Sequence, residues 1–321
     1  MSPITTLVRR DVVSTNSTLK LWEVGPRDGL QSEKQTLPLE KKRHMVAALM
    51  DAGVRQIEVG SFVKAVPQLR DTDELVKQLA DHPLRYQTKF TGLVFNERGL
   101  ERALESGVDG VCLVVFPSET MAIKNSGVGS YEGLRRALDL ASSAKKENLF
   151  VRVDIGTAWT CPYEGLISAE KVFEFSSALL SVPYTDEVAL ADTLGHAHPT
   201  EVMKRFLPLT QRYGTERLAA HFHDTQGFAL ANVTAAYSIG VSVFDASVGG
   251  LGGCPFAPGA AGNLATEDLL LFAQKMQDSQ LNSVDLSRVW KLIDDLEACV
   301  DRPLGGRSRG WWRGRQESIR L

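Results

Sequence analysis

The chain has 321 residues, of which 43% are hydrophobic and 23% charged. This length and balance are typical of a globular protein that buries a sizeable core. The formal net charge of -3 argues against general binding to nucleic acid or to anionic membranes.

The four cysteines, Cys112, Cys161, Cys254 and Cys299, are scattered and form no CxxC pair. This argues against a disulfide framework or a zinc finger and favours a reducing compartment. No apolar run reaches the ~20 residues that would span a bilayer, and the N-terminus lacks the apolar region of a secretory signal. We therefore expect a cytoplasmic protein. The Arg and Ser/Thr residues of 1–18 are consistent with an alternative, in which this segment is a short mitochondrial transit peptide.

Eight short apolar segments rich in β-branched residues predict strands. In chain order they are 19–24, 55–60, 88–94, 110–116, 150–156, 187–191, 217–222 and 241–248. Helical periodicity lies between them, for example at 39–52, 97–107, 131–147, 168–181, 199–213 and 226–239. Several of these helical segments end in Gly followed by Val, and Gly is the residue that commonly closes a helix.

Strand and helix alternating eight times predict a TIM (β/α)8 barrel. We assign the barrel to residues 19–300, with an N-terminal extension at 1–18 and an Arg/Trp-rich tail at 301–321. An open doubly wound sheet is the competing architecture. It is disfavoured because the first strand runs into Gly-Pro-Arg-Asp-Gly rather than a Gly-rich phosphate loop.

Polar residues cluster at the carboxyl ends of the predicted strands, the face on which TIM barrels carry their catalytic groups. They are Arg27 and Asp28 after the first strand, Glu58 and Ser61 after the second, Asp192 after the sixth, His221 and His223 at the seventh, and Cys254 and Asn263 after the eighth.

His221 and His223 are two residues apart, so on a strand both rings face the same side. Asp28 and Asn263 arrive from the neighbouring first and eighth strands of a closed barrel. Two imidazoles, a carboxylate and an amide oxygen form a mixed nitrogen and oxygen shell. Such a shell suits Mg2+ or Mn2+, with Co2+ or Zn2+ as substitutes.

Arg27 has two readings, a salt bridge to Glu58 or Asp192, or a fixed positive charge beside a developing enolate oxygen. Cys254 lies within a run of Gly and Pro. A thiol in such a loop is less easily explained as a small buried hydrophobe. The loop can instead place the thiol over the site as a proton donor.

These residues stand in motifs that resemble the 3-hydroxy-3-methylglutaryl-CoA lyase family. The sequence EVGPRDGLQ around Asp28 is similar to the opening signature of that family, and HFHDT around His221 is similar to its metal-binding segment. The run GLGGCPFAPGAAGNLATED is similar to its glycine-rich cysteine loop. IEVGSFV, VPQLRDTDE and CPYEG fit as well, and the resemblance covers roughly residues 19–275 in order.

The resemblance implies an acyl-CoA lyase that releases acetyl-CoA and a keto acid, acetoacetate if the substrate is 3-hydroxy-3-methylglutaryl-CoA. It also implies a homodimer. The metal ligands would be Asp28, His221, His223 and Asn263. The proton of the tertiary hydroxyl would pass to Asp28 or its neighbourhood, Arg27 would stabilise the enolate and Cys254 would protonate it. Three further residues would support the ligands, namely Gln31, Glu58 and Asp192.

Several positions depart from the family pattern and leave the acyl group open, among them the following three. Trp159 stands where smaller residues are common and is expected to narrow the acyl pocket, while His196 and His198 replace small or apolar residues. Citramalyl-CoA, which would yield pyruvate, is therefore an alternative substrate. An acetyl-CoA condensing synthase and a non-catalytic metal- or RNA-binding barrel are the competing functions. The tail is expected to be packed or solvated, with a lid or an oligomer contact through Trp311 and Trp312 as alternatives.

Overall fold

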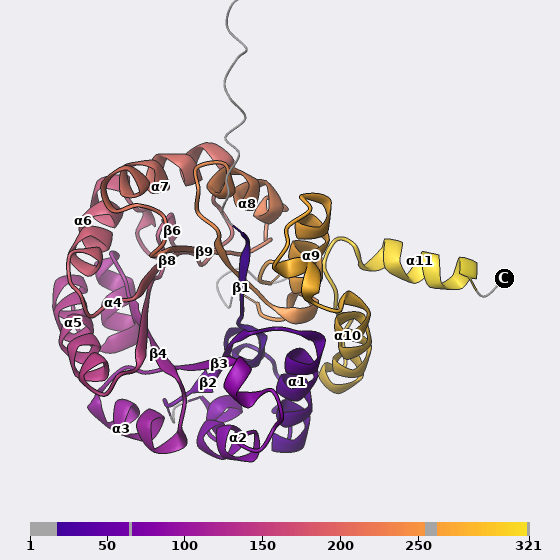
Figure 1. Ribbon diagram of the computed structural model, residues 1–321. Helices are drawn as coiled ribbons and strands as arrows, with labels where there is room; N and C mark the ends of the chain where they lie inside the picture. The colour runs from indigo at the N-terminus through magenta and orange to yellow at the C-terminus, as the bar shows by residue number, and fades with distance from the viewer. Residues whose placement is uncertain (1–17, 64–65, 254–261, 320–321) are drawn as a thin grey trace, which may run out of the picture.

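The computed structural model describes residues 18–63, 66–253 and 262–319. Its centre is a closed barrel of eight parallel strands, which confirms the predicted TIM barrel (Figure 1). The barrel strands are β1 (Lys20–Glu23), β2 (Gln56–Ser61), β3 (Lys89–Leu93), β4 (Gly110–Val115), β5 (Phe150–Ile155), β8 (Glu187–Asp192), β9 (Leu218–Phe222) and β10 (Val243–Ala246). The short strands β6 (Thr160–Cys161) and β7 (Gly165–Leu166) form a hairpin after β5.

Helices form a ring around the barrel, as Figure 1 shows. They are α1 (Leu39–Ala52), α2 (Thr72–Gln78), α3 (Glu97–Ser106), α4 (Glu119–Ser126), α5 (Ser130–Lys146), α6 (Ala169–Leu180), α7 (Pro199–Tyr213), α8 (Ala229–Tyr237) and α9 (Thr266–Lys275), followed by α10 (Leu286–Val300) and α11 (Arg309–Ile319). Within the described ranges, no helix has the length and apolarity needed to cross a membrane.

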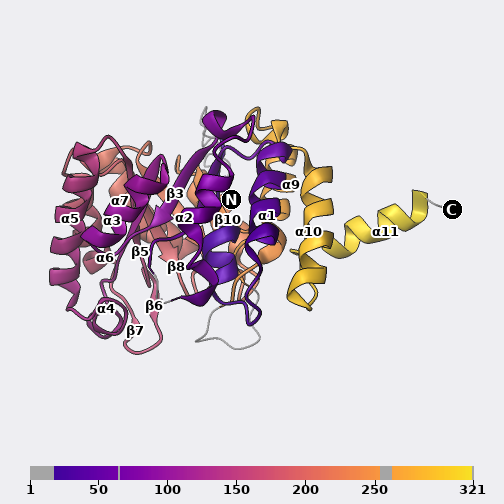
Figure 2. The ribbon, with the colours of Figure 1, turned by 90° about the horizontal axis from the view of Figure 1, so that it is seen from below.

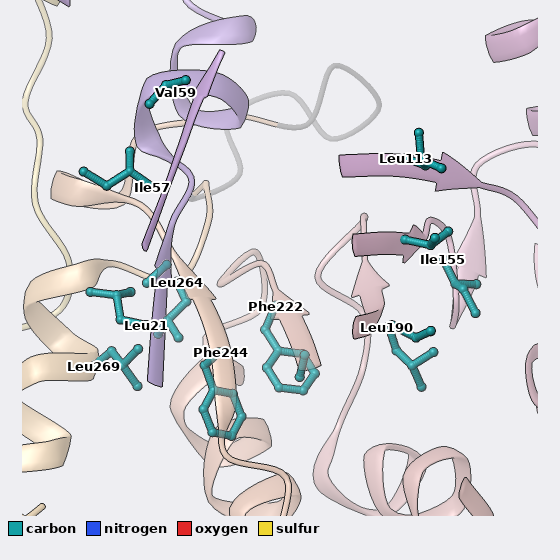
Figure 3. Close-up of a cluster of buried hydrophobic side chains, with 14 of the residues drawn as sticks. Leu21, Ile57, Val59, Leu113, Ile155, Leu190, Phe222, Phe244, Leu264 and Leu269 are labelled. Atoms are coloured by element: carbon teal, nitrogen blue, oxygen red, sulfur yellow. The ribbon is translucent and has the colours of Figure 1, made fainter. Parts of the chain in front are cut away.

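The outer face of the strands carries the main hydrophobic core. Figure 3 shows part of it, with Leu21, Ile57 and Leu190 on strands of the barrel wall and Leu269 on α9. Phe222 and Phe244 belong to the same cluster and are buried. Because side chains alternate across a strand, the neighbours of these residues in sequence face the barrel interior.

The tail begins as a packed segment and ends in a projecting helix. Arg307 Nε lies 2.7 Å from Asp224 Oδ2, and the Trp312 ring stacks on Trp290 of α10 with centroids 5.2 Å apart. Beyond these contacts α11 extends away from the barrel, as Figures 1 and 2 show from two directions. Trp311 on this helix is 53% exposed.

Glu23, at the end of β1, joins three segments around the carboxyl end of the barrel. Its Oε1 accepts hydrogen bonds from the backbone N–H groups of Gly25, at 2.8 Å, and Val248, at 3.0 Å. Its Oε2 accepts from the hydroxyl of Thr266 at 2.6 Å. A Cβ at position 25 would lie 2.6 Å from Oε1, so this turn requires glycine. The carboxyl group is fully buried, and burial raises the pKa of Glu23 to about 7.

This pKa predicts a loss of stability as pH rises. The folded protein holds the Glu23 proton more tightly than the unfolded chain, where the pKa is near 4.5. The contribution of Glu23 to the free energy of unfolding is therefore fully present below the unfolded pKa and is lost as pH rises through about 7. Between about pH 6 and about pH 8 we expect the titration of Glu23 to lower the free energy of unfolding by about 1 kcal/mol.

Glu23→Gln removes the titration and keeps the contacts, because the amide oxygen accepts from both N–H groups and the amide nitrogen donates to Thr266. Urea unfolding at both pH values measures the effect. The free energy of unfolding of Glu23→Gln should fall less than that of the wild type. The other buried acids are common to both proteins, so parallel pH profiles would contradict the assignment.

Candidate metal centre and active site

Asp28, His221 and His223 converge at the carboxyl end of the barrel. Their ligand atoms all lie within 4.8 Å of one another. The Asp28 Oδ2 atom is 4.0 Å from His221 Nε2 and 3.9 Å from His223 Nε2. Of the described residues, these are the only group of three or more His, Cys, Asp or Glu side chains so arranged.

A tight turn after β1 brings Asp28 to this point. Gly25–Gly29 form a short π-helical turn, in which the N–H groups of Arg27, Asp28 and Gly29 all bond to the Val24 carbonyl at 2.8–3.1 Å. Such turns are rare and occur frequently at functional sites. The turn places the Asp28 side chain opposite the end of β9, which carries His221, with His223 one residue beyond the strand.

The second nitrogen of each histidine has a hydrogen-bond partner. His223 Nδ1 lies 2.9 Å from the backbone carbonyl of Asp192, and His221 Nδ1 lies 2.9 Å from Oδ2 of Asp245. Both partners accept hydrogen bonds, so each Nδ1 carries the proton. The lone pair of each neutral ring is then on Nε2, the atom that faces Asp28, as in histidine ligands of metal ions.

The side chain of Asn263 contacts Asp28 at the same point. Its Nδ2 donates to Asp28 Oδ2 at 2.9 Å and to the Leu251 carbonyl at 3.1 Å. Its Oδ1 is buried and has no hydrogen-bond partner. A buried acceptor without a partner costs free energy unless another group satisfies it. The donor set of two Nε2 atoms, one carboxylate and this oxygen fits a divalent cation.

Arg27 forms one of the two salt bridges expected from the sequence. Its Nε lies 2.8 Å from Glu58 Oε2, and its Nη1 lies 2.6 Å from Asp28 Oδ1. Burial acts to raise the pKa of the Asp28 carboxyl, but the positive charge of Arg27, with smaller electrostatic contributions from the two histidines, outweighs it and holds that pKa well below its usual range. Asp28 is therefore ionised at physiological pH, as a metal ligand must be.

Of the predicted supporting residues, Glu58 and Asp192 lie at the site. Burial, with a contribution from the negative charge of Asp154, raises the pKa of Glu58 to about 7. Burial also raises the pKa of Asp192 to about 6, although its carboxylate accepts N–H bonds from His196 and Ala197. Carboxyl groups with raised pKa values are often found at functional sites.

Gln31 is exposed just beyond the π-helical turn. His196 and His198 are exposed on the segment between β8 and α7, in agreement with the simpler of their two readings. Cys254 lies outside the described residues, so its predicted role as a proton donor stays a prediction.

Trp159 lies in the core, which does not support the expectation that it narrows the acyl pocket. It is 2% exposed, and its ring centroid lies 5.9 Å from that of Phe222 and 6.4 Å from that of Phe206 on α7. Phe222 stands between the two inward histidines and therefore faces outward. Trp159 thus packs between the barrel wall and α7, where it fills core volume.

Sequence reasoning missed Asp245 and Arg152, which lie beneath His221 in the barrel interior. Asp245 contacts His221, and Arg152 Nη2 lies 2.7 Å from both Asp245 carboxylate oxygens. Both occur inside apolar segments, 150–156 and 241–248, which were read as plain strands. Arg152 and Asp245 each stand next to an outward-facing residue, Val153 and Phe244 respectively. Strand alternation could therefore have indicated that both face the barrel interior.

Comparison with known proteins places the chain in a family. The HMGL-like family model matches residues 18–296. The chain is 38% identical over 288 residues to the hydroxymethylglutaryl-CoA lyase YngG of Bacillus subtilis, covering 89% of this chain and 94% of that protein. It is 35% identical over 291 residues to the (R)-citramalyl-CoA lyase of Chloroflexus aurantiacus, covering 88% and 91%.

Solved structures agree with these relatives. The HMG-CoA lyase of Bacillus subtilis superposes with a TM-score of 0.87 at 36% identity, covering 92% of this chain and 98% of that one. An HMG-CoA lyase from Acinetobacter baumannii, solved with coenzyme A and 3-methylmalate, superposes with a TM-score of 0.83 at 34% identity, covering 91% and 94%.

The metal centre predicts that His223→Ala weakens Mn2+ binding at least ~100-fold, because it removes a ligand rather than an outer partner. Titration of the metal-free protein, followed by the electron paramagnetic resonance of free Mn2+, measures this affinity. His198→Ala is the matched control, since His198 is an exposed histidine at the start of α7. Equal affinities for the two variants would remove His223 from the site.

The placement of Trp159 predicts that Trp159→Ala lowers the free energy of unfolding by about 3–5 kcal/mol and leaves Mn2+ affinity unchanged. Leu166→Ala serves as the control, because Leu166 is 85% exposed in the neighbouring hairpin. That change should stay within about 0.5 kcal/mol. A similar small effect for Trp159→Ala would show that the ring is not part of the core.

Proposed function

Because the chain belongs to the HMGL-like family and is a carbon–carbon lyase, we propose that it cleaves 3-hydroxy-3-methylglutaryl-CoA into acetyl-CoA and acetoacetate. The observation that carries this proposal is the convergence of Asp28, His221 and His223 beside the buried guanidinium of Arg27. A cation site next to a fixed positive charge is suited to the two oxygens that develop charge in such a cleavage.

In this proposal Asp28, His221, His223 and Asn263 hold Mg2+ or Mn2+. A divalent cation bound there lowers the pKa of a substrate hydroxyl and orients it for cleavage. The depressed pKa of Asp28 favours ligation over proton transfer. Asp192, with a pKa of about 6, has a proton affinity closer to that of a general base working near neutral pH.

In the proposed cleavage, the hydroxyl proton passes to the base and a carbonyl forms on the keto product. The carbon–carbon bond breaks at the same time, and its electron pair stays with the thioester fragment. The electron pair becomes the enolate of acetyl-CoA, beside the positive charge of Arg27. Cys254 gives its proton to the enolate carbon, which completes acetyl-CoA, and the proton held by the base then returns through solvent to the Cys254 thiolate, which restores both groups. Glu58 holds Arg27 in place through their 2.8 Å ion pair.

Citramalyl-CoA is the second candidate substrate, favoured by the similarity to the Chloroflexus aurantiacus enzyme. The experiment offers purified protein with Mg2+ or Mn2+ three classes of thioester: 3-hydroxy-3-methylglutaryl-CoA, citramalyl-CoA and longer 3-hydroxy-3-alkylglutaryl-CoAs. Acetoacetate as the main product supports the proposal, and pyruvate supports the second candidate. Condensation of acetyl-CoA with a keto acid, without cleavage of any thioester, would instead indicate a synthase.

The homodimer and the cytoplasmic location expected from the sequence belong to the same proposal. Light scattering of the purified protein tests the first, and fractionation of cells that express the native chain tests the second. If light scattering shows a monomer, the proposed homodimer is contradicted and the proposed chemistry is unaffected.

We predict that Cys254→Ala and His223→Ala each lower kcat by at least ~100-fold, the first by removing the proton donor and the second by removing a ligand. Release of acetyl-CoA in a coupled assay measures both. Cys299→Ala is the control, because Cys299 is a half-buried thiol on α10. Near-wild-type turnover in both site variants would overturn the assignment of these residues.

A further inference from the structure

A buried ionic network fills the barrel interior below the proposed metal centre. At its middle is Arg152 of β5, only 3% exposed. Its Nε lies 2.8 Å from Asp154 Oδ1, and its Nη1 lies 2.9 Å from Glu187 Oε1. Its Nη2 lies 2.7 Å from both oxygens of Asp245 on β10. One guanidinium thus contacts three buried carboxylates from three different strands.

Asp245 is the member of this network that reaches the site. It is 2% exposed, and its Oδ2 lies 2.9 Å from His221 Nδ1. The other nitrogen of the same ring, Nε2, points toward Asp28. A continuous chain therefore runs from Arg152 through Asp245 and His221 to the point where the ligand atoms converge.

We propose that Asp245 is a positioning residue for the metal ligand His221, and that Arg152 holds the Asp245 carboxylate in the orientation this requires. The inference rests on the metal centre of the proposed function. Asp245 fixes the ring in the tautomer with its proton on Nδ1, so that the Nε2 lone pair faces the cation. A carboxylate in this position also makes the imidazole a stronger ligand.

The geometry requires a carboxylate rather than any polar side chain. Both Asp245 oxygens lie 2.7 Å from a guanidinium nitrogen, which only donates hydrogen bonds. An amide at this position has one oxygen and one NH2 group. In either orientation its NH2 group faces a donor of Arg152, so Asp245→Asn loses the geometry that His221 needs.

Glu187 offers a matched control within the same network. Its Oε1 accepts hydrogen bonds from both Arg152 and the indole N–H of Trp22, each at 2.9 Å. Glu187→Gln keeps an oxygen for both donors and removes the same charge from the same interior. Glu187 is buried like Asp245, and its Oε1 bonds go to the guanidinium and the indole rather than to His221.

The experiment measures the Mn2+ dissociation constant of the purified, metal-free variants by electron paramagnetic resonance. Asp245→Asn should raise this constant by about 10–100-fold, the usual effect of removing an outer partner of a ligand. Glu187→Gln should stay within about 3-fold of the wild type. Equal increases in both variants would indicate an effect of net charge alone, and no increase in Asp245→Asn would overturn the proposal.

A measurement on the wild type keeps the test decisive if Asp245→Asn does not fold. The chain has six histidines, so 15N-histidine labelling gives a simple spectrum. At high pH, His221 should show its proton on Nδ1 before Mg2+ is added and keep it there afterwards. A proton on Nε2 would overturn the proposal. Turnover is tested separately, because an enzyme that binds Mn2+ but does not cleave 3-hydroxy-3-methylglutaryl-CoA contradicts the proposed substrate and leaves this inference standing.

Discussion

The pairing of β1 with β10 is the constraint on which the site depends, because it closes the barrel. Its register sets Glu23 opposite Ala246 and Trp22 opposite Asp245. Closure brings Asp28 within 2.9 Å of Asn263, although 235 positions separate them in the chain. Glu23 then ties the π-helical turn to the segments that follow β10. A shift of one residue along this pair would turn the side chains of one of the two strands over, and either Asp245 or Trp22 would leave the interior.

The polar interior has a physical cost that an ordinary barrel core avoids. Branched apolar side chains usually fill this space, and a buried ion pair often stabilises a fold no better than apolar residues of the same volume. Arg152 and its carboxylates are therefore poorly explained by stability alone. The contact of Asp245 with His221 supplies a reason in the proposed role, since a carboxylate held rigidly by Arg152 restricts where the histidine ring can point.

The sequence was sufficient for the fold and for the convergence of the three candidate ligands because both follow from local patterns. The eight strands were predicted to within two residues, the largest difference being 243–246 observed against 241–248 expected. His221, His223 and Asp28 meet as spacing and strand order require. Arg152 and Asp245 escaped notice because a charged residue inside an apolar strand has meaning only when its partners on other strands are known. The role expected of Trp159 failed for a related reason, since the direction of a loop side chain is not fixed by strand alternation.

The position of Trp159 also changes the argument about the substrate. As a pocket residue it would have favoured a small acyl group, but it packs between the barrel wall and α7 instead. No described contact of Trp159 then disfavours a longer alkyl chain on the carbon that bears the hydroxyl. In the proposed mechanism, the residues that perform cleavage act on the hydroxyl and on the enolate, which all such thioesters have in common. Selection among acyl groups must therefore come from side chains other than the ligands, so variants of the ligands will change turnover for every substrate in the same proportion.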